Sequence, residues 1–182
     1  FRNLRSVKEA TGDLDRMAKT RTLCGEDFDI LSGDDDKTFD MMTRDDVRAS
    51  GVISVMSNIV PGPVGEMVKA IRNGNMERAN RLKDILDPLF KVVTVTTVES
   101  YEGFEVPCKF RNPLAIKTMM KGLGLPSGPT RPPLGKMTPK GVGIVRNALK
   151  ETYGKGKEVF WPLQEFYRIN IEERLASDRY WK

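Results

Sequence analysis

Lys8 is the residue of this 182-residue chain whose type and position best fit covalent chemistry. It follows the short apolar stretch of residues 4–7 and precedes a turn at Gly12, which places it at the carboxyl end of a predicted strand. In parallel sheets these ends carry active sites. Burial against strand residues disfavours an ammonium group, and the neutral amine can attack a carbonyl carbon to form a Schiff base. The alternative for Lys8 is a structural ion pair, for example with Glu9.

Three consecutive aspartates at residues 34–36 are a second group that could do chemistry. They could bind Mg²⁺, but carboxylates that open a helix commonly act as caps and first-turn residues, so we expect capping. Their charge would repel phosphate, which disfavours a phosphorylated substrate. The preceding Gly33 indicates a backbone with positive φ or a close approach to a ligand, unless it is a plain turn glycine.

Several classes of function are excluded by composition. The chain has no histidine, and its two cysteines, Cys24 and Cys108, are far apart in the sequence. Imidazole catalysis and His-ligated metals are therefore excluded, and neither a zinc motif nor a disulfide framework is indicated. The sequence signatures of nucleophile elbows, P-loops and dinucleotide sites do not occur. No stretch approaches the roughly 20 apolar residues that span a bilayer, and we expect a reducing, cytoplasmic location.

The net charge of +5 is unevenly distributed along the chain. Residues 109–157 contain 11 lysines and arginines against one acid, Glu151. Such a segment could contact nucleic acid, but its charges alternate with Pro, Gly and apolar positions, and it contains few aromatic residues. A solvated basic surface is therefore the favoured interpretation, with a non-catalytic nucleic-acid-binding module as the alternative from another class.

A pattern of apolar stretch, turn and amphipathic stretch occurs three times in the first 73 residues. Strands are predicted at residues 4–7, 28–31 and 52–55, and Val7, Ile30 and Ile53 within them recur at intervals of 23 residues, as successive βα units do. Apolar strands that do not alternate with polar residues indicate burial on both faces, which is typical of a parallel sheet covered by helices. The fold class is therefore α/β.

The rest of the chain is predicted to be mainly helical. An apolar stripe predicts a long helix over residues 76–89, and two further helices are expected at residues 113–122 and 139–153. Residues 91–98 are β-branched but continue a strong helix, so both states remain open. We therefore divide the chain into βα units (1–73), a helical region (74–153) and an aromatic tail (154–182) that should pack on a surface.

Three sequence segments, taken in order, carry a resemblance to a known family. Residues 7–13 read Val-Lys-Glu-Ala-Thr-Gly-Asp, residues 31–35 read Leu-Ser-Gly-Asp-Asp and residues 51–55 read Gly-Val-Ile-Ser-Val. Together with Asn-Pro-Leu-Ala-Ile-Lys at 112–117, they resemble dihydrodipicolinate synthase. The resemblance covers the carboxyl-terminal half of that family's subunit.

The resemblance implies a (β/α)₈ TIM barrel, to which this chain supplies the last three βα units and a C-terminal helical region. It further implies a cytoplasmic homotetramer that condenses pyruvate with L-aspartate 4-semialdehyde in lysine and diaminopimelate biosynthesis. Lys8 matches the lysine that forms the imine with pyruvate, and Gly33 and Ile53 match positions lining the pyruvate pocket, the latter through its carbonyl. No metal or organic cofactor is implied, and neither a nucleic acid nor a membrane is an expected partner.

A complete barrel needs about 250 residues. We therefore expect the amino-terminal half to be supplied by the same or a companion chain, because three strands alone leave unpaired edges. The alternatives within the superfamily are an N-acetylneuraminate lyase and a sugar-acid aldolase, which would use the same lysine.

Overall fold

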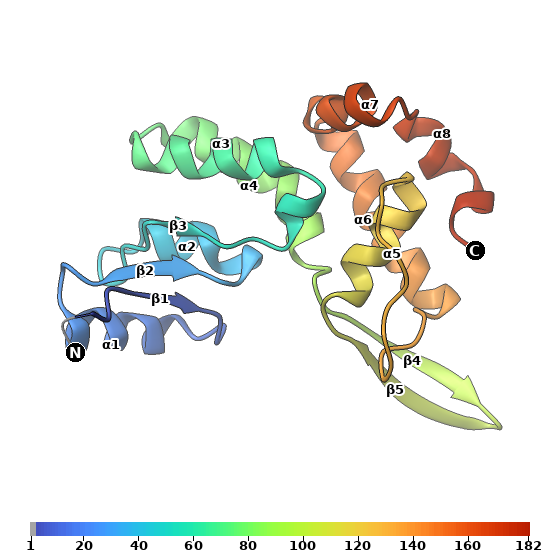
Figure 1. The fold of residues 1–182 in the computed structure, drawn as a ribbon, viewed down its shortest axis with the longest axis horizontal. Helices are drawn as coiled ribbons and strands as arrows, with labels where there is room; N and C mark the ends of the chain where they lie inside the picture. Colours follow the sequence, from blue (N-terminus) through green and yellow to red (C-terminus); the bar gives the residue numbers. More distant parts are fainter. Residues whose placement is uncertain (1–2) are drawn as a thin grey trace. The chain divides into compact units, whose positions relative to one another are not determined.

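The computed structural model describes residues 3–182, which form two compact units, Phe1–Asp84 and Ile85–Lys182. The first contains a parallel sheet and the second an antiparallel hairpin with a group of helices (Figure 1). Each unit has its own buried residues and is described separately below.

Three parallel strands form the sheet of the first unit, in the order β1 (Ser6–Glu9), β2 (Asp29–Ser32) and β3 (Gly51–Val52). Each is followed by a helix, namely α1 (Leu14–Cys24), α2 (Thr38–Thr43) and α3 (Pro61–Arg72). Short 3₁₀ turns, η1 (Asp35–Lys37) and η2 (Met56–Asn58), follow β2 and β3. Three βα units therefore occur where the sequence predicts them.

The register agrees with the sequence repeat at one of its two intervals. Val7 pairs with Ile30, as the 23-residue spacing predicts. Leu31, however, pairs with Gly51, so Ile53 lies beyond the end of β3 instead of inside it. The third strand is consequently shorter than predicted, and Ile53 belongs to the loop that follows it.

Helices cover one face of this sheet. Val7 and Ile30 point into the apolar core that α1 and α2 build against them; of their immediate strand neighbours Leu31 is half-buried and the others are exposed. Ser6 and Lys8, which point to the other face, are exposed. The prediction that both faces are buried is therefore wrong for Ser6 and Lys8 within the first unit. The buried core comprises Met17, Ile30, Met41, Met42, Val47 and Ala49.

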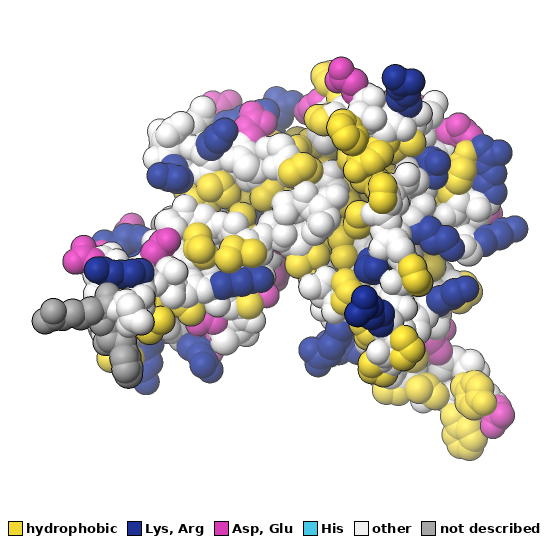
Figure 2. All heavy atoms as spheres, in the orientation of Figure 1, with side chains coloured by type: hydrophobic (Ala, Val, Ile, Leu, Met, Phe, Trp, Pro, Cys, Tyr) yellow, Lys and Arg dark blue, Asp and Glu magenta, His cyan; other side chains and the backbone are white. Residues whose placement is uncertain are grey.

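The second unit contains a β-hairpin in a region for which the sequence allowed either helix or strand at residues 91–98. After α4 (Met76–Phe90), which crosses the boundary between the units, come β4 (Val95–Tyr101) and β5 (Phe104–Phe110). β-branched residues fit a pleated strand, and the turn residues Glu102 and Gly103 both have positive φ, as a tight hairpin requires. The region predicted to be helical thus includes a β-hairpin. Apolar side chains gather at its tip, where Tyr101 and Phe104 are exposed (Figure 2).

The remaining elements of the second unit are helical. They are α5 (Leu114–Leu123), α6 (Pro139–Lys155), η3 (Lys157–Phe160), α7 (Trp161–Tyr167), α8 (Ile171–Ala176) and η4 (Asp178–Tyr180). The aromatic tail packs within this unit only in part. Phe160 is fully buried and Trp181 lies directly over Gly122 of α5, whereas Trp161, Phe166 and Tyr167 are exposed.

Candidate active site

The three residues predicted to form a site, Lys8, Gly33 and Ile53, lie together at the carboxyl ends of the three parallel strands. The Gly33 N–H donates a 2.7 Å hydrogen bond to the carbonyl of Glu9, next to Lys8. The Ile53 N–H donates a 2.8 Å hydrogen bond to the carbonyl of Ser32, next to Gly33. These two bonds continue the strand pairing and connect the three post-strand segments in order.

Gly33 is explained by the close approach of Lys8. A Cβ atom at Gly33 would lie 2.7 Å from Lys8 Cε, 3.0 Å from Lys8 Cγ and 2.7 Å from Ala10 Cβ. Carbon atoms in contact normally lie about 3.5–4.0 Å apart, so no side chain fits there. Gly33 does not have positive φ. Positive φ therefore does not explain this glycine. The group that lies against it in the structure is the stem of Lys8, and the approach of a ligand stays a prediction.

Lys8 itself is exposed, and its ammonium forms no ion pair or hydrogen bond with any described residue. The ion pair with Glu9 is not formed; the Glu9 carboxylate is buried and accepts a 3.0 Å hydrogen bond from the Thr11 N–H. The expected removal of this amine from water is not achieved by the described residues, because it extends from the uncovered face of the sheet.

Asp35 fixes the loop that carries Ile53. Its Oδ2 accepts hydrogen bonds of 2.9 Å from the Val55 N–H and 3.1 Å from the Met56 N–H. The residue is only 4% exposed, and its Oδ1 has no partner among the described residues. Because these bonds join the segments after β2 and β3, Asp35 sets the position of the Ile53 backbone relative to Gly33.

Asp35 and Asp36 lie in the first turn of η1, as expected, but the expected side-chain cap is not formed. Asp34 precedes η1, but its side chain makes no capping hydrogen bond, and Asp36 pairs with Lys37 at 3.3 Å. Partial burial, together with the neighbouring Asp36 charge, raises the pKa of Asp34 above its usual value. The backbone of Asp34 is held by hydroxyls, since Ser32 Oγ and Thr38 Oγ1 both donate to its carbonyl at 2.9 and 3.1 Å.

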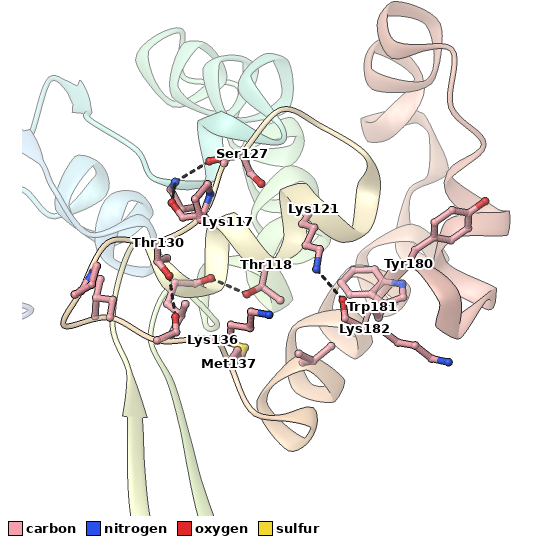
Figure 3. A pocket seen from close by; sticks show the side chains of 17 residues that line it. Lys117, Thr118, Lys121, Ser127, Thr130, Lys136, Met137, Tyr180, Trp181 and Lys182 are labelled. Carbon is pink, nitrogen blue, oxygen red and sulfur yellow. Dashed lines mark hydrogen bonds between the residues drawn. The ribbon is translucent and has the colours of Figure 1, made fainter.

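No metal site is evident among residues 3–182: no three Asp, Glu or Cys side chains lie close enough together to bind an ion. None of the helices described is both long and apolar enough to cross a membrane. A cavity of about 580 Å³ lies in the second unit, and neither Lys8, Gly33 nor Ile53 lines it (Figure 3).

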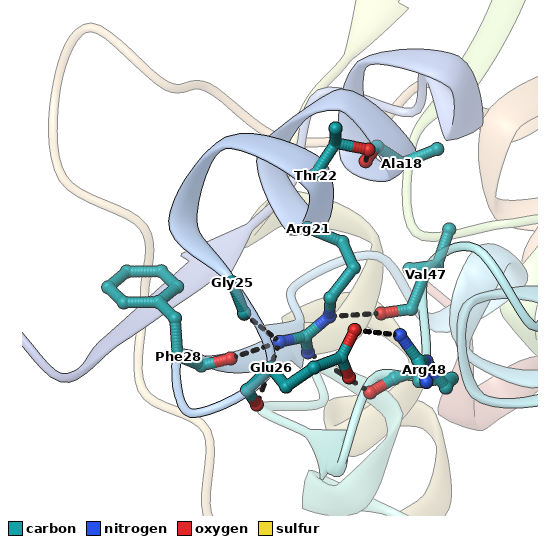
Figure 4. A network of polar contacts seen from close by, with 8 residues as sticks. All are labelled: Ala18, Arg21, Thr22, Gly25, Glu26, Phe28, Val47 and Arg48. Atoms are coloured by element: carbon teal, nitrogen blue, oxygen red, sulfur yellow. Dashed lines mark hydrogen bonds and ion pairs between the residues drawn. The ribbon is translucent and has the colours of Figure 1, made fainter.

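Arg21 supports the opposite end of the sheet and was not singled out from the sequence. Its guanidinium is buried at the end of α1 and donates to five backbone carbonyls (Figure 4). The only sequence signal for it is a basic residue in the last turn of a helix, which is common. The accepting carbonyls are those of Gly25, Glu26, Phe28, Val47 and Arg48.

The sequence profile of the Dihydrodipicolinate synthetase family matches residues 1–152. The chain belongs to this family. The 4-hydroxy-tetrahydrodipicolinate synthase of Thermoanaerobacter sp. (strain X514) is 35% identical over 156 residues, which are 86% of this chain and 46% of that protein. These matches confirm the resemblance drawn from the three sequence segments.

Solved structures give the same result. The 4-hydroxy-tetrahydrodipicolinate synthase of Methylacidiphilum fumariolicum SolV aligns with a TM-score of 0.71 and 31% identity, over 87% of this chain and 47% of that one. Dihydrodipicolinate synthase of Aquifex aeolicus aligns with a TM-score of 0.66 and 34% identity, over 82% and 45%. The fold is therefore of the α/β TIM-barrel class, and the chain spans less than half the length of these relatives. A nucleic-acid-binding module is not favoured.

Proposed function

We propose that this chain carries the imine-forming lysine of a pyruvate-dependent lyase of the dihydrodipicolinate synthase type. The reaction is condensation of pyruvate with L-aspartate 4-semialdehyde to 4-hydroxy-tetrahydrodipicolinate, a step of lysine and diaminopimelate biosynthesis. The packing of the Lys8 stem on Gly33 carries the proposal. Because Gly33 has no side chain, the stem of Lys8 lies directly against its backbone, and this contact positions the amine at the carboxyl ends of the strands. Family membership and the names of the relatives support the substrate class.

In the proposed reaction the neutral Lys8 amine attacks the keto carbon of pyruvate. A C–N bond forms, and the keto oxygen leaves as water to give the imine. Loss of a proton from the methyl carbon then gives an enamine, whose carbon forms the new C–C bond with the aldehyde carbon of the semialdehyde. Gly33 keeps space for the lysine stem, and the Ile53 carbonyl, held by the loop that Asp35 anchors, lines the pyruvate site.

The exposed amine requires a cover that the described residues do not provide. We propose that further βα units, from the same polypeptide or a companion chain, close the sheet over Lys8 and exclude water. On this proposal residues 1–73 are the last three βα units, 74–153 the C-terminal helical region and 154–182 an extension of it. The uncovered sheet face and the length of the relatives support this arrangement. A homotetramer in the cytoplasm is the proposed working form.

Product analysis of the intact assembly tests the proposed reaction. The purified protein, with all its polypeptide components, is incubated with pyruvate and either L-aspartate 4-semialdehyde or N-acetylmannosamine, and products are identified by mass spectrometry. We expect condensation with the semialdehyde only, and none with a Lys8→Ala variant that has an unchanged circular dichroism spectrum. Formation of N-acetylneuraminate instead would assign the site to a sialic-acid lyase, and an active Lys8→Ala variant would remove Lys8 from the mechanism.

A further inference from the structure

The cavity of about 580 Å³ in the second unit is formed by α5, by the connector between α5 and α6, by Val142 of α6 and by the end of the chain (Figure 3). Helix α5 contributes Leu114 and Thr118, the connector between α5 and α6 contributes residues from 127 to 137, and Trp181 closes one side. Its volume lies within the range of about 300–1,000 Å³ that is typical of small-molecule sites. The cavity is therefore large enough for a ligand.

The lining combines an apolar surface with positive charge. Four lysines line the cavity, and none of its lining residues is acidic. Lys117 Nζ donates to the carbonyls of Ser127 and Pro129 at 2.7 and 3.0 Å, and Lys121 Nζ donates to the carbonyl of Lys182 at 2.7 Å. The carbonyls of Ser127 and Pro129 are neutral, so they satisfy the Lys117 ammonium without cancelling its charge. The apolar lining is supplied by Leu114, Pro129, Pro132, Leu134, Met137, Val142 and Trp181.

Lys136 and Lys182 are the two lining lysines whose ammonium groups are not bonded to a described residue, and Lys136 belongs to the connector that forms the cavity. Its side chain reaches toward Thr118 across the cavity (Figure 3), and its ammonium has no ion pair or hydrogen bond with a described residue. The segment 109–157, to which Lys136 belongs, contains eleven lysines and arginines and one acid, Glu151. Positive potential over an apolar floor favours an organic anion.

The wall formed by Trp181 belongs to residues 153–182, which lie outside the region matched by the family profile. A Cβ at Gly122 would lie 2.5 Å from the Trp181 ring, so the ring packs directly on the α5 backbone. The indole N–H donates a 2.7 Å hydrogen bond to the carbonyl of Arg174. These contacts hold the ring rigidly and preform the cavity.

We infer that this cavity binds an organic anion with an apolar body, its acidic group at Lys136 and its body against Trp181 and the α5 connector. The inference is independent of the proposed reaction, because it uses no residue of the Lys8 site. Either a carboxylate or a sulfonate would satisfy the chemistry, since both present acceptor oxygens to an ammonium.

Fluorescence titration of the intact protein with 8-anilinonaphthalene-1-sulfonate tests the inference. We expect saturable binding to one site, weakened about fivefold by Lys136→Gln, as expected for loss of a partly exposed charge contact. Lys150→Gln removes the same charge from an exposed position on α6 outside the cavity and should leave binding unchanged. The neutral analogue N-phenyl-1-naphthylamine should bind more weakly to the wild type and equally to both variants.

A second variant keeps the test decisive. Val142→Phe places a larger side chain on the cavity lining and should reduce binding of both probes, with an unchanged near-ultraviolet circular dichroism spectrum as the control for folding. Equal affinity for the charged and neutral probes would overturn the assignment to anions. Binding that is insensitive to both Lys136→Gln and Val142→Phe would show that this cavity is not the site.

Discussion

Gly33→Ala is the substitution that most sharply separates the role of Lys8 from general stability. The added methyl would lie 2.7 Å from both Lys8 Cε and Ala10 Cβ. Relative to ordinary contact distances, each overlap is about 1 Å. Lys8 can move its flexible stem away, whereas Ala10 Cβ is attached to the backbone. The substitution should therefore displace the amine and also strain the segment after β1.

The expected stability loss is about 1–3 kcal/mol, the usual range for overpacking, reduced by about 0.4–1 kcal/mol because alanine restricts the unfolded chain more than glycine does. Displacement of a reacting group by 1 Å costs roughly 100-fold in rate. Urea unfolding measures the first effect, and the initial rate of pyruvate-dependent borohydride labelling measures the second.

Gly51→Ala is the matched control. The same methyl at Gly51 would meet Leu31 Cδ2 at 3.8 Å and Val68 Cγ1 at 4.0 Å, which are ordinary contacts. We expect unchanged labelling and equal or slightly higher stability. The double variant Gly33→Ala/Ala10→Gly should recover stability but not labelling, because it relieves the backbone contact and leaves Lys8 displaced. Wild-type labelling by Gly33→Ala, with stability equal to that of Gly51→Ala, would refute this reasoning.

Three further predictions concern groups that support the two units. Asp35→Ala should lower the free energy of unfolding by about 2 kcal/mol, because it leaves two backbone N–H groups unpaired, and a variant as stable as wild type in urea would show that another group replaces it. Arg21→Met should lower the free energy of unfolding by about 3 kcal/mol, because it removes charged hydrogen bonds to buried carbonyls. Arg16→Met, at an exposed position on the same helix, is the control and should change the free energy of unfolding little. Equal losses in the two variants, measured by urea unfolding, would contradict the role of the Arg21 network. Hydroxyl donation from Thr138 holds the pKa of Glu99 below its ordinary value of 4.5, so its stabilising effect should be complete above pH 4.5 and lost as the pH falls through the lowered pKa. The difference in melting temperature between wild type and Glu99→Gln should accordingly shrink on acidification, and a difference independent of pH would contradict this.

The spacing of apolar residues along the chain predicted most of the long helices but not the hairpin. The helices predicted over residues 76–89, 113–122 and 139–153 are α4, α5 and α6, and their limits agree within a few residues. The hairpin was not predicted because residues 91–98 are β-branched but directly follow a strong helix. Their pairing with residues 104–110 depends on contacts between separate segments, which local periodicity does not show.

The candidate site was predictable only at the level of residue type. Lys8 lies near the carboxyl end of β1, Gly33 and Ile53 follow β2 and β3, and parallel pairing brings the carboxyl ends of the strands together. Asp35 was expected to cap a helix because carboxylates favour helix starts. Its carboxylate instead accepts hydrogen bonds from the N–H groups of Val55 and Met56, some 20 residues further along the chain. Side-chain contacts over that separation leave no local pattern to detect.

The central claim is that the Lys8 amine forms an imine with pyruvate. Borohydride reduction in the presence of pyruvate, followed by tryptic digestion and mass spectrometry, tests it most directly. We predict that the peptide of residues 6–16 gains the mass of pyruvate less water plus two hydrogens and is not cleaved after Lys8. An adduct confined to another lysine, or an active assembly whose Lys8 peptide stays unlabelled, would contradict the account.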